Sequence, residues 1–521
     1  MDRFASQLRA RSVAHPLVSI PVITLLALVL ALAPLQVALG FGGLVVAAAL
    51  AVLGPIWGVY LVLLSVPIQQ QIVLPGGTSF TQAAVLLMAA AWALRLIAQP
   101  HRPIVSGRLF WCWLALLGAL LLATSLTPYD RAESLKATLR WVVAFLVWFV
   151  AVNATTRRWQ LVGLVACLLA APTAEALVGL YQFLVGTGPP SFRIATSLPF
   201  VRAYGTIGQP NSFAGYMNMA WPLALALAIG VTLVYARRGQ ESAERRAQSA
   251  ERRVQSAERT NKRLVAIGLV GAVLLWMMAG ALLLALGASF SLGGWVGALV
   301  GCLGLSICLG RRWALLALGS ALVLVAFSVL GGVNLLPSAI SGRVTRLTGL
   351  LSFFDPATVT VTPENFALVE RMAQMKAGAL MFLAHPLVGV GPGAYSLAYG
   401  DVASAPWYAS RGHAHNFYLH MAAETGTLGL AAYLLLIGGA LGQALRALRQ
   451  ADTIVARSTI VGCCGIIAAV AGHNLFENLH VLNFGVQLSG VWALATVLPH
   501  IRAASDAPHA AQNDSDPHTR F

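Results

Sequence analysis

The 521-residue sequence contains little charge, because Asp, Glu, Lys and Arg together make up only 10% of it. A water-soluble domain carries roughly a quarter charged residues, so this composition excludes an ordinary soluble protein. Hydrophobic residues account for 58% of the chain, and its mean hydropathy is +0.76. We therefore expect an integral protein of the lipid bilayer.

Acidic residues are the scarcer charge: 18 Asp and Glu stand against 34 Lys and Arg, a net charge of +16. In a soluble chain such an excess suggests a nucleic-acid partner. Here most basic residues lie in short gaps between apolar segments, where they determine membrane topology. We predict no nucleic-acid partner.

The six cysteines all lie within apolar segments, so the sequence implies neither a disulfide framework nor a zinc cluster.

Fourteen apolar segments are candidates for transmembrane helices, each of which needs about 20 residues to cross the hydrocarbon core. They lie near residues 17–35, 41–53, 56–73, 80–98, 109–126, 138–154, 160–184, 211–235, 264–287, 291–310, 313–334, 425–444, 458–475 and 482–499. The second is short and meets the third at Gly54-Pro55, so the first four form either four spans or two spans plus a re-entrant piece. We predict an all-α polytopic membrane protein with 12–14 transmembrane helices.

The basic residues decide the predicted orientation. With a cytoplasmic N-terminus, 24 of the 34 Lys and Arg lie on the cytoplasmic side, as the positive-inside rule requires. Two polar loops then face the other side of the membrane. The predicted organisation is N-terminal transmembrane helices in 1–184, a short outside loop in 185–210, transmembrane helices in 211–334 with a charged cytoplasmic linker at 236–263, a large outside loop in 335–424, C-terminal transmembrane helices in 425–500 and a cytoplasmic tail in 501–521.

The charged linker repeats with a period of seven over residues 240–260, which leaves a narrow seam of mostly alanine on a charged helix. Two interpretations are open: a short coiled coil, or a solvated helical extension near anionic headgroups. The alanine-rich seam favours the solvated helix.

The large outside loop contains ordered elements. Apolar and charged residues alternate at helical spacing from Asn365 to Ala384, which predicts an amphipathic helix that ends at His385-Pro386. The glycines of residues 389–393 predict a tight turn. Two histidines and an arginine then precede a membrane segment, in the sequence Arg411-Gly412-His413-Ala414-His415-Asn416, and Glu424 follows at the start of that segment.

The histidine pair has more than one interpretation. A His-x-His sequence alone is more often structural than a metal site, and no third ligand cluster is evident. The acids of the outside loops are scattered, without paired carboxylates. We therefore predict no catalytic metal and no cofactor. A neutral imidazole with a pKa near 6.5 can nevertheless accept a proton from a hydroxyl at neutral pH.

The short outside loop contributes Arg193 and Arg202, followed by Pro210 and Asn211 where a helix starts. We expect Asn211 or Ser212 to cap this helix. Arginines beside a helix N-terminus form a phosphate site, whereas interfacial anchoring is the equally weighted alternative.

Two further polar features remain ambiguous. Glu175 lies in the middle of an apolar segment, where an acid indicates a lined cavity or paired charge, or else a hydrogen bond between helices. Within residues 471–480, a polar cluster fits a catalytic and a structural network equally well. Its members are His473, Asn474, Glu477, Asn478 and His480.

The pattern His415-Asn416, nine residues, Gly426, two residues, Gly429 resembles the signature of bacterial O-antigen ligases and the related O-antigen polymerase superfamily. The segment from His385 to Gly393 resembles the same loop of that family. Residues 202–206 together with Pro210-Asn211 are similar to its other outside motif. These matches cover roughly residues 190–480, in the expected order and on the predicted side.

The resemblance implies a GT-C-like fold and a metal-independent, inverting glycosyltransferase of the bacterial inner membrane, with its active site facing the periplasm. Its donor would be a glycan on undecaprenyl pyrophosphate, and its acceptor the lipid A core or a polysaccharide. The resemblance makes His415 the general base and Arg202 a pyrophosphate contact. We further expect Arg193, Arg411 and Asn211 to contact the donor. Supporting roles fall to His413, Asn416, Glu424 and Glu175.

The sequence departs from the family at one position. Many relatives carry Ser-Arg-Gly where this chain has Ser291-Leu292-Gly293, so the arginine expected at Leu292 is missing. We expect Arg343, Arg346 or Arg411 to supply the charge. A protein O-oligosaccharyltransferase is the closest alternative function, and a lipid-linked glycan flippase is the alternative from another class. The low charge inside the spans favours the enzyme.

Overall fold

The computed structural model describes residues 35–72, 79–101, 103–194, 199–248, 255–330, 335, 341–342, 354–362 and 365–506. Of the described residues, 76% are helical and none lies in a β-strand. One isolated bridge pairs Arg193 with Val201. The predicted all-α polytopic class is therefore confirmed.

Ten helical spans among the described residues are long and apolar enough to cross a membrane, and they follow the apolar segments of the sequence. The helices that form them are α5 (Phe80–Ala98), α6 (Gly107–Leu126), α7 (Arg131–Ala154), α8 (Arg158–Val185), α9 (Pro210–Asn218) continued by α10 (Trp221–Gln248), α11 (Gln255–Ala288), α12 (Leu292–Leu309), α17 (Phe417–Arg449), α18 (Ile454–His473) and α19 (Phe484–Asp506). Another apolar helix, α13 (Arg311–Val329), packs beside α12.

The N-terminal segments contain a sharp bend. Helices α3 (Leu35–Leu53) and α4 (Ile56–Ser65) meet at 118°, so that the pair is either a broken span or a re-entrant piece. Gly54 makes the bend with a φ of 123°, a conformation that favours glycine, and Pro55 begins the next helix. The first apolar segment lies almost entirely outside the described residues, so the total of 12–14 spans stays a prediction.

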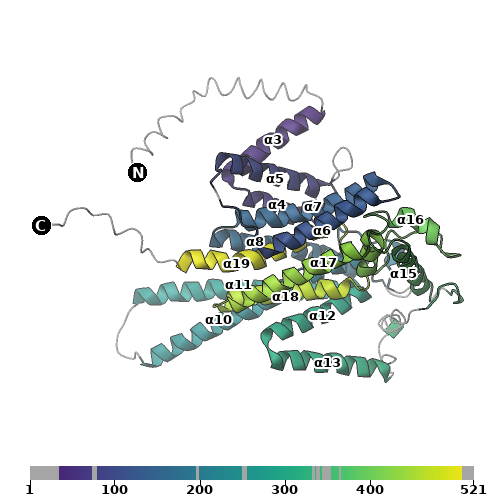
Figure 1. The fold of residues 1–521 in the computed structure, drawn as a ribbon. Helices are drawn as coiled ribbons and strands as arrows, with labels where there is room; N and C mark the ends of the chain where they lie inside the picture. Colours follow the sequence, from purple (N-terminus) through teal and green to yellow (C-terminus); the bar gives the residue numbers. More distant parts are fainter. Residues whose placement is uncertain are drawn as a thin grey trace.

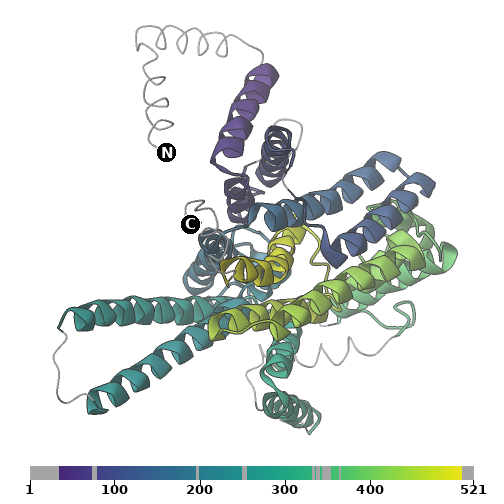
Figure 2. The same ribbon diagram turned by 60° about the vertical axis from the view of Figure 1, so that its left-hand side comes forward.

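The bundle has two distinct ends (Figures 1 and 2). One end holds the loop helices α15 (Phe366–Ala384) and α16 (Tyr395–Val402) together with the start of α17, and we call it the histidine end. At the opposite end, the paired helices α10 and α11 extend beyond the other helices. The amphipathic helix predicted for residues 365–384 is confirmed as α15.

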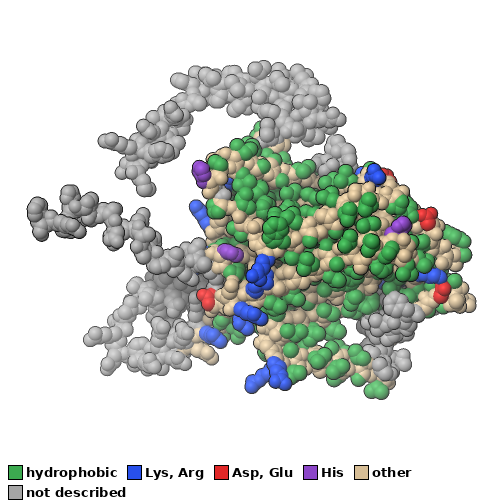
Figure 3. Space-filling model, viewed as in Figure 1, with side chains coloured by type: hydrophobic (Ala, Val, Ile, Leu, Met, Phe, Trp, Pro, Cys, Tyr) green, Lys and Arg blue, Asp and Glu red, His purple; other side chains and the backbone are tan. Residues whose placement is uncertain are grey.

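Charge is distributed unevenly between these ends (Figure 3). Lys and Arg side chains gather at the end opposite the histidine end, which we call the basic end, and hydrophobic side chains cover much of the middle of the visible face. This distribution agrees with the orientation expected from the positive-inside rule.

Glycine allows α12 to pack closely on α18. A Cβ atom at Gly301 would lie 2.9 Å from the Cβ of Ala469, and one at Gly297 would lie 2.8 Å from the carbonyl oxygen of Ala469. Small residues at such positions let membrane helices approach at backbone distance. The close packing brings the end of α18 beside the start of α12.

The charged linker at 236–263 falls partly outside the described residues, so the choice between a coiled coil and a solvated helix is untested.

Candidate active site

The start of α17 presents the predicted histidines at the histidine end. Asn416 is the N-cap residue of α17, and its side chain accepts a hydrogen bond of 3.0 Å from the backbone N–H of Leu419. The backbone N–H of Phe417 donates to the carbonyl of Asn474 at 2.8 Å, which ties α17 to the end of α18. His415 precedes this cap with a positive φ of 52°, unusual for a residue other than glycine.

Glu477 lies in the connection between α18 and α19, and one of its carboxylate oxygens lies close to a ring nitrogen of both histidines. Its Oε1 is 3.3 Å from Nε2 of His413 and 3.4 Å from Nδ1 of His415. The two imidazole centroids are 4.2 Å apart. The side chain of Glu477 is only 8% exposed, whereas those of His413 and His415 are 21% and 14% exposed. A buried carboxylate thus holds two partly accessible imidazoles.

The other oxygen of Glu477 faces amide and guanidinium groups. Asn211 donates to Oε2 through Nδ2 at 2.8 Å, and Nη2 of Arg371 lies 3.9 Å from it. The Oδ1 of Asn211 accepts a hydrogen bond of 3.0 Å from Nη2 of Arg202. Arg202 also donates through Nε to the carbonyl of Ser289 at 2.8 Å. One carboxylate therefore joins the 202–211 segment and the histidine loop to the connection between α18 and α19.

The hydrogen bonds define the tautomer of His413. Its Nδ1 accepts a hydrogen bond of 3.1 Å from the backbone N–H of His415, so the neutral ring carries its proton on Nε2, which faces Glu477. Burial lowers the pKa of His413 to about 3, although the charge of Glu477 opposes this shift. His413 is accordingly neutral near pH 7.

Glu477 is ionised. Burial alone would raise its pKa, but the interaction with His415 and the positive charge of Arg371 outweigh burial and hold the pKa well below its usual range. The Nδ1 of His415 has no partner of hydrogen-bond geometry among the described residues, and its 3.4 Å approach to the carboxylate is long. A proton on Nδ1 would face Glu477 and leave Nε2 as the proton acceptor, the orientation a general base requires.

Glu175 positions the loop that carries Arg202. Its carboxylate, in a side chain buried within α8, accepts hydrogen bonds from the backbone N–H groups of Thr206 at 2.6 Å and Ile207 at 3.1 Å, and from the hydroxyl of Thr206 at 2.9 Å. Gly205 has a φ of 60°, and a Cβ there would overlap Oε1 of Glu175. Glu175, the acid in the middle of the apolar segment, therefore fixes the conformation of the 202–208 loop through hydrogen bonds to its backbone.

The capping expected for the helix after this loop is wrong. The N-cap residue of α9 is Gln209, which makes no side-chain cap hydrogen bond, and Pro210 occupies the first helical turn. Asn211 lies inside the helix, and its amide bridges Arg202 and Glu477 instead. The long-range partners use both ends of the amide, so none of it is left for the local cap.

Backbone pairing explains the glycine motif of the large loop. Gly426 adopts a φ of 62° and a ψ of −163°, which breaks α17. At this break the N–H of Thr427 donates to the carbonyl of Pro386 at 2.8 Å, and the N–H of Gly391 donates to that of Glu424 at 2.8 Å. A Cβ at Gly389 would lie 2.2 Å from the carbonyl carbon of Glu424. The glycines thus interlock the 386–391 segment with α17, the helix that follows the histidines.

Other predicted residues have different surroundings. Arg411 donates through Nε to Glu370 of α15 at 2.7 Å and so links the histidine loop to the helix that carries Arg371. The side chain of Arg193 is exposed, and its backbone pairs with Val201. Arg343 and Arg346 lie outside the described residues.

Glu424 has a structural environment inside α17. Its Oε1 accepts a hydrogen bond of 3.1 Å from the N–H of Tyr395, and its Oε2 lies 3.5 Å from Nε2 of His420.

Leu292 begins α12, where Ser291 caps the helix by accepting from the N–H of Gly294 at 3.2 Å. Leu292 itself supplies no charge, and among the described residues the guanidinium groups near Glu477 are those of Arg202 and Arg371.

Sequence reasoning missed two members of the site. Arg371 was recognised only as a charge on the amphipathic helix, and Glu477 only as one residue of the polar cluster at 471–480. Their meeting depends on the packing of α15 against α17 and on the connection after α18. The adjacent charges Glu370 and Arg371 on α15, which pair with Arg411 and Glu477, were the available signal.

His413, His415 and Glu477 also have the geometry of a metal site, because one ligand atom from each lies within 4.8 Å of the others. The expectation that no third ligand would be found near the histidines is therefore wrong. However, the proton on Nε2 of His413 occupies the nitrogen that would bind an ion, and Arg371 places a positive charge beside the same carboxylate. The contacts present already satisfy the carboxylate without a metal.

The fold and the site together define a class: an all-α polytopic membrane protein with two histidines, a buried glutamate and guanidinium groups gathered at one end of its bundle. Residues 275–434 match the family model described as O-Antigen ligase. This match supports assignment of the chain to the O-antigen ligase and polymerase superfamily that its motifs resemble. It includes the histidine loop, α15 and the Gly426 break, and it leaves out Arg202, Asn211 and Glu477. No curated protein matches the chain.

Proposed function

We propose that the protein is a metal-independent, inverting glycosyltransferase that moves a glycan from undecaprenyl pyrophosphate to a hydroxyl acceptor on the periplasmic side of the inner membrane. The observation that carries the proposal is the convergence of His415, Glu477, Arg202 and Arg371 at the histidine end. An imidazole suits removal of a hydroxyl proton, and guanidinium groups suit a pyrophosphate. The family match supports ligase or polymerase chemistry in general.

In the proposed reaction, Nε2 of His415 removes the proton from an acceptor hydroxyl while Glu477 orients the ring from the other side. The acceptor oxygen attacks the anomeric carbon, and the bond between that carbon and the phosphate oxygen breaks. The electron pair of the broken bond leaves with undecaprenyl pyrophosphate. A single in-line displacement of this kind inverts the anomeric configuration.

The leaving group carries negative charge that the site must stabilise. Arg202 and Arg371 flank the Asn211–Glu477 bridge and supply two guanidinium groups for the pyrophosphate. We propose that Arg371 replaces the arginine missing at Leu292. Arg411 then acts by positioning, because its ion pair with Glu370 holds the histidine loop against α15. Arg193 remains a proposed donor contact at the edge of the loop.

A flippase would use acids within the spans as part of a polar path. Glu175 is the residue that would favour this alternative, and its carboxylate is engaged by the backbone of the 202–208 loop. This engagement favours the one-sided enzyme. The acceptor stays open between the lipid A core, a second lipid-linked repeat and a protein hydroxyl.

The direct test is an assay in detergent, where no membrane separates two compartments. Purified protein should form a glycosidic product from a lipid-linked donor without nucleotide or added metal. A ladder of repeats would identify a polymerase, and a single addition to core lipid would identify a ligase. The proposal would be overturned if protein with a cooperative thermal unfolding transition formed no product with any of the three acceptor types.

A further inference from the structure

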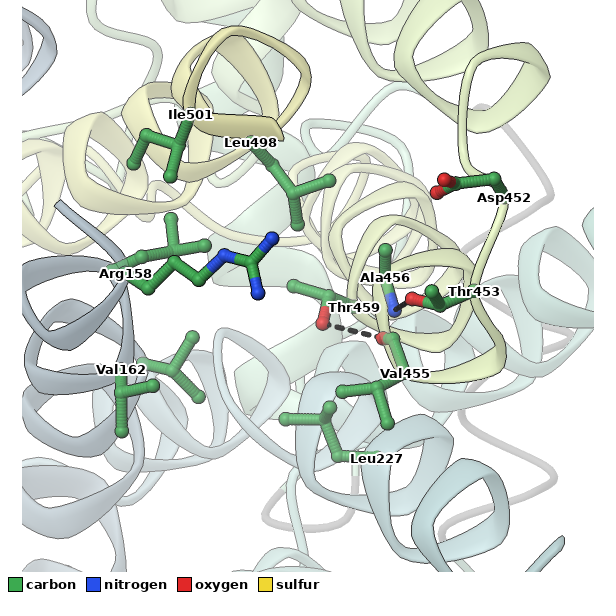
Figure 4. Close-up of a pocket in the computed structure, with 12 residues that line it drawn as sticks. Arg158, Val162, Leu227, Asp452, Thr453, Val455, Ala456, Thr459, Leu498 and Ile501 are labelled. Carbon is green, nitrogen blue, oxygen red and sulfur yellow. Dashed lines mark hydrogen bonds between the residues drawn. The ribbon is translucent and has the colours of Figure 1, made fainter. Parts of the chain in front are cut away.

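The basic end of the bundle contains cavities that the proposed reaction does not use. One is an apolar cavity of about 410 Å³ between α8, α10, α18 and α19, with Arg158 and Asp452 at its wall (Figure 4). A second, of about 720 Å³, lies between the start of α6 and the ends of α17 and α19. The second is the more polar of the two and contains two arginines.

We propose that this second cavity binds the phosphate headgroup of an anionic phospholipid from the leaflet at the basic end. Arg108 and Arg446 line it from α6 and α17, together with His500, Gln443 and Ser106 among other residues. Guanidinium groups form strong charge-assisted hydrogen bonds with phosphate oxygens. Basic pockets between membrane helices on the cytoplasmic side are typical sites for anionic headgroups.

The first turn of α6 adds donors to the same cavity. Ser106 is the N-cap residue of this helix and makes no side-chain cap hydrogen bond, so the first N–H groups have no side-chain partner from it. The positive end of a helix dipole favours an anion at this place. The preceding residue is held rigidly, because Asn153 accepts from the N–H of Val105 at 2.8 Å and donates to its carbonyl at 3.1 Å.

Trp148 closes the inner wall of the cavity. The side chain of Trp148 is fully buried and lines the cavity, yet its indole N–H has no hydrogen-bond partner among the described residues. An unsatisfied buried donor costs free energy unless a ligand or water accepts from it. The ring has no accessible surface, so a bound headgroup would contact the arginines and the first turn of α6 rather than this N–H.

The surroundings favour a lipid over a free phosphate. Val105, Leu109 and Pro499 give the cavity apolar walls beside its arginines. An amphiphile satisfies both parts. Asp452 is the one carboxylate that lines the cavity, and the two guanidinium groups leave the described lining with a positive balance.

The test is native mass spectrometry of delipidated protein with phosphatidylglycerol or phosphatidylcholine of identical acyl chains. We expect wild-type protein to retain phosphatidylglycerol in preference, and the double variant Arg108→Gln/Arg446→Gln to lose about tenfold in apparent affinity. The matched control is Arg449→Gln, a change on the last turn of α17 outside the cavity lining, which should bind like wild type.

Three outcomes would overturn the proposal. They are equal retention of both lipids by wild-type protein, unchanged affinity of the double variant, and a thermal shift from inorganic phosphate equal to that from phosphatidylglycerol. If the double variant fails to fold, the single variants Arg108→Gln and Arg446→Gln provide the second measurement. Each should retain less phosphatidylglycerol than wild-type protein, and unchanged retention in both would contradict the site.

Discussion

His415 and Glu477 meet at 3.4 Å, Nδ1 to Oε1, although one residue precedes α17 and the other follows α18. The contact depends on the antiparallel packing of these helices and on the hydrogen bond from the N–H of Phe417 to the carbonyl of Asn474. The carboxylate is buried and ionised, so it can hold the imidazole in one orientation. The contact between His415 and Glu477 cannot be predicted from the sequence around either residue.

His415→Ala should reduce glycan transfer by about 10²–10⁴-fold, because general-base catalysis contributes a factor of this size. The measurement is product formation from lipid-linked donor by purified protein. The thermal transition of the variant should remain close to that of wild type, since His415 is partly accessible. Transfer at the wild-type rate would show that another group accepts the proton.

Arg371→Gln should lower kcat by about 10²-fold, because it removes a guanidinium group from the developing charge of the leaving pyrophosphate. Lys376→Gln is the matched control. It removes a positive charge from the same helix, where Lys376 pairs with Asp355 at 2.9 Å, and should leave transfer unchanged. Equal losses in both variants would mean that α15 acts through its net charge or stability.

Chelators should leave transfer unchanged. EDTA and 1,10-phenanthroline remove divalent ions from sites made of histidine and glutamate, and the proposed chemistry needs none. Activity that disappears on chelation and returns with one particular ion would instead make His413, His415 and Glu477 metal ligands.

Stability should fall as the pH drops from 7.5 to 5.5. The pKa of His413 in the folded protein is about 3, so the unfolded chain, with a histidine pKa near 6.5, binds the proton that the folded state rejects. This difference costs about 1 kcal/mol over that interval. His413→Gln should therefore reduce the pH dependence of the Tm. An unchanged slope would show that the folded imidazole titrates normally.

Gly426→Ala should destabilise the protein by about 1–3 kcal/mol, because the positive φ strains any residue with a Cβ. That Cβ would also lie 2.2 Å from the carbonyl carbon of Leu387. Gly438→Ala, in open space on the same helix, is the control and should be neutral or slightly stabilising. Thermal unfolding of both variants measures the difference. Equal Tm values would contradict the interlock between α17 and the 386–391 segment.

Hydropathy predicted the spans well, because each membrane helix must satisfy its own backbone and show an apolar surface to lipid. The amphipathic pattern likewise predicted α15 to within one residue. The bend between α3 and α4 was visible only as an ambiguity at Gly54-Pro55, since a turn between two apolar helices fits a pair of spans and a re-entrant piece alike.

The site was predictable where function depends on local motifs. His415, Arg202 and Asn211 lie in such motifs, and the structure joins them through Glu477. Arg371 and Glu477 were not predicted as site residues, because their approach arises from tertiary packing between segments far apart in the chain. Arg411 shows what the sequence does not reveal: its charge predicts a donor contact, which stays a prediction, whereas its ion pair with Glu370 follows from tertiary packing.

A single carboxylate with two imidazoles on one oxygen and an amide on the other makes its neighbours energetically interdependent. Losses measured for Asn211 and His413 separately should not add up in the double variant, and a mutant cycle should give a large coupling term. Over evolutionary time, exchanges at these positions should occur in concert.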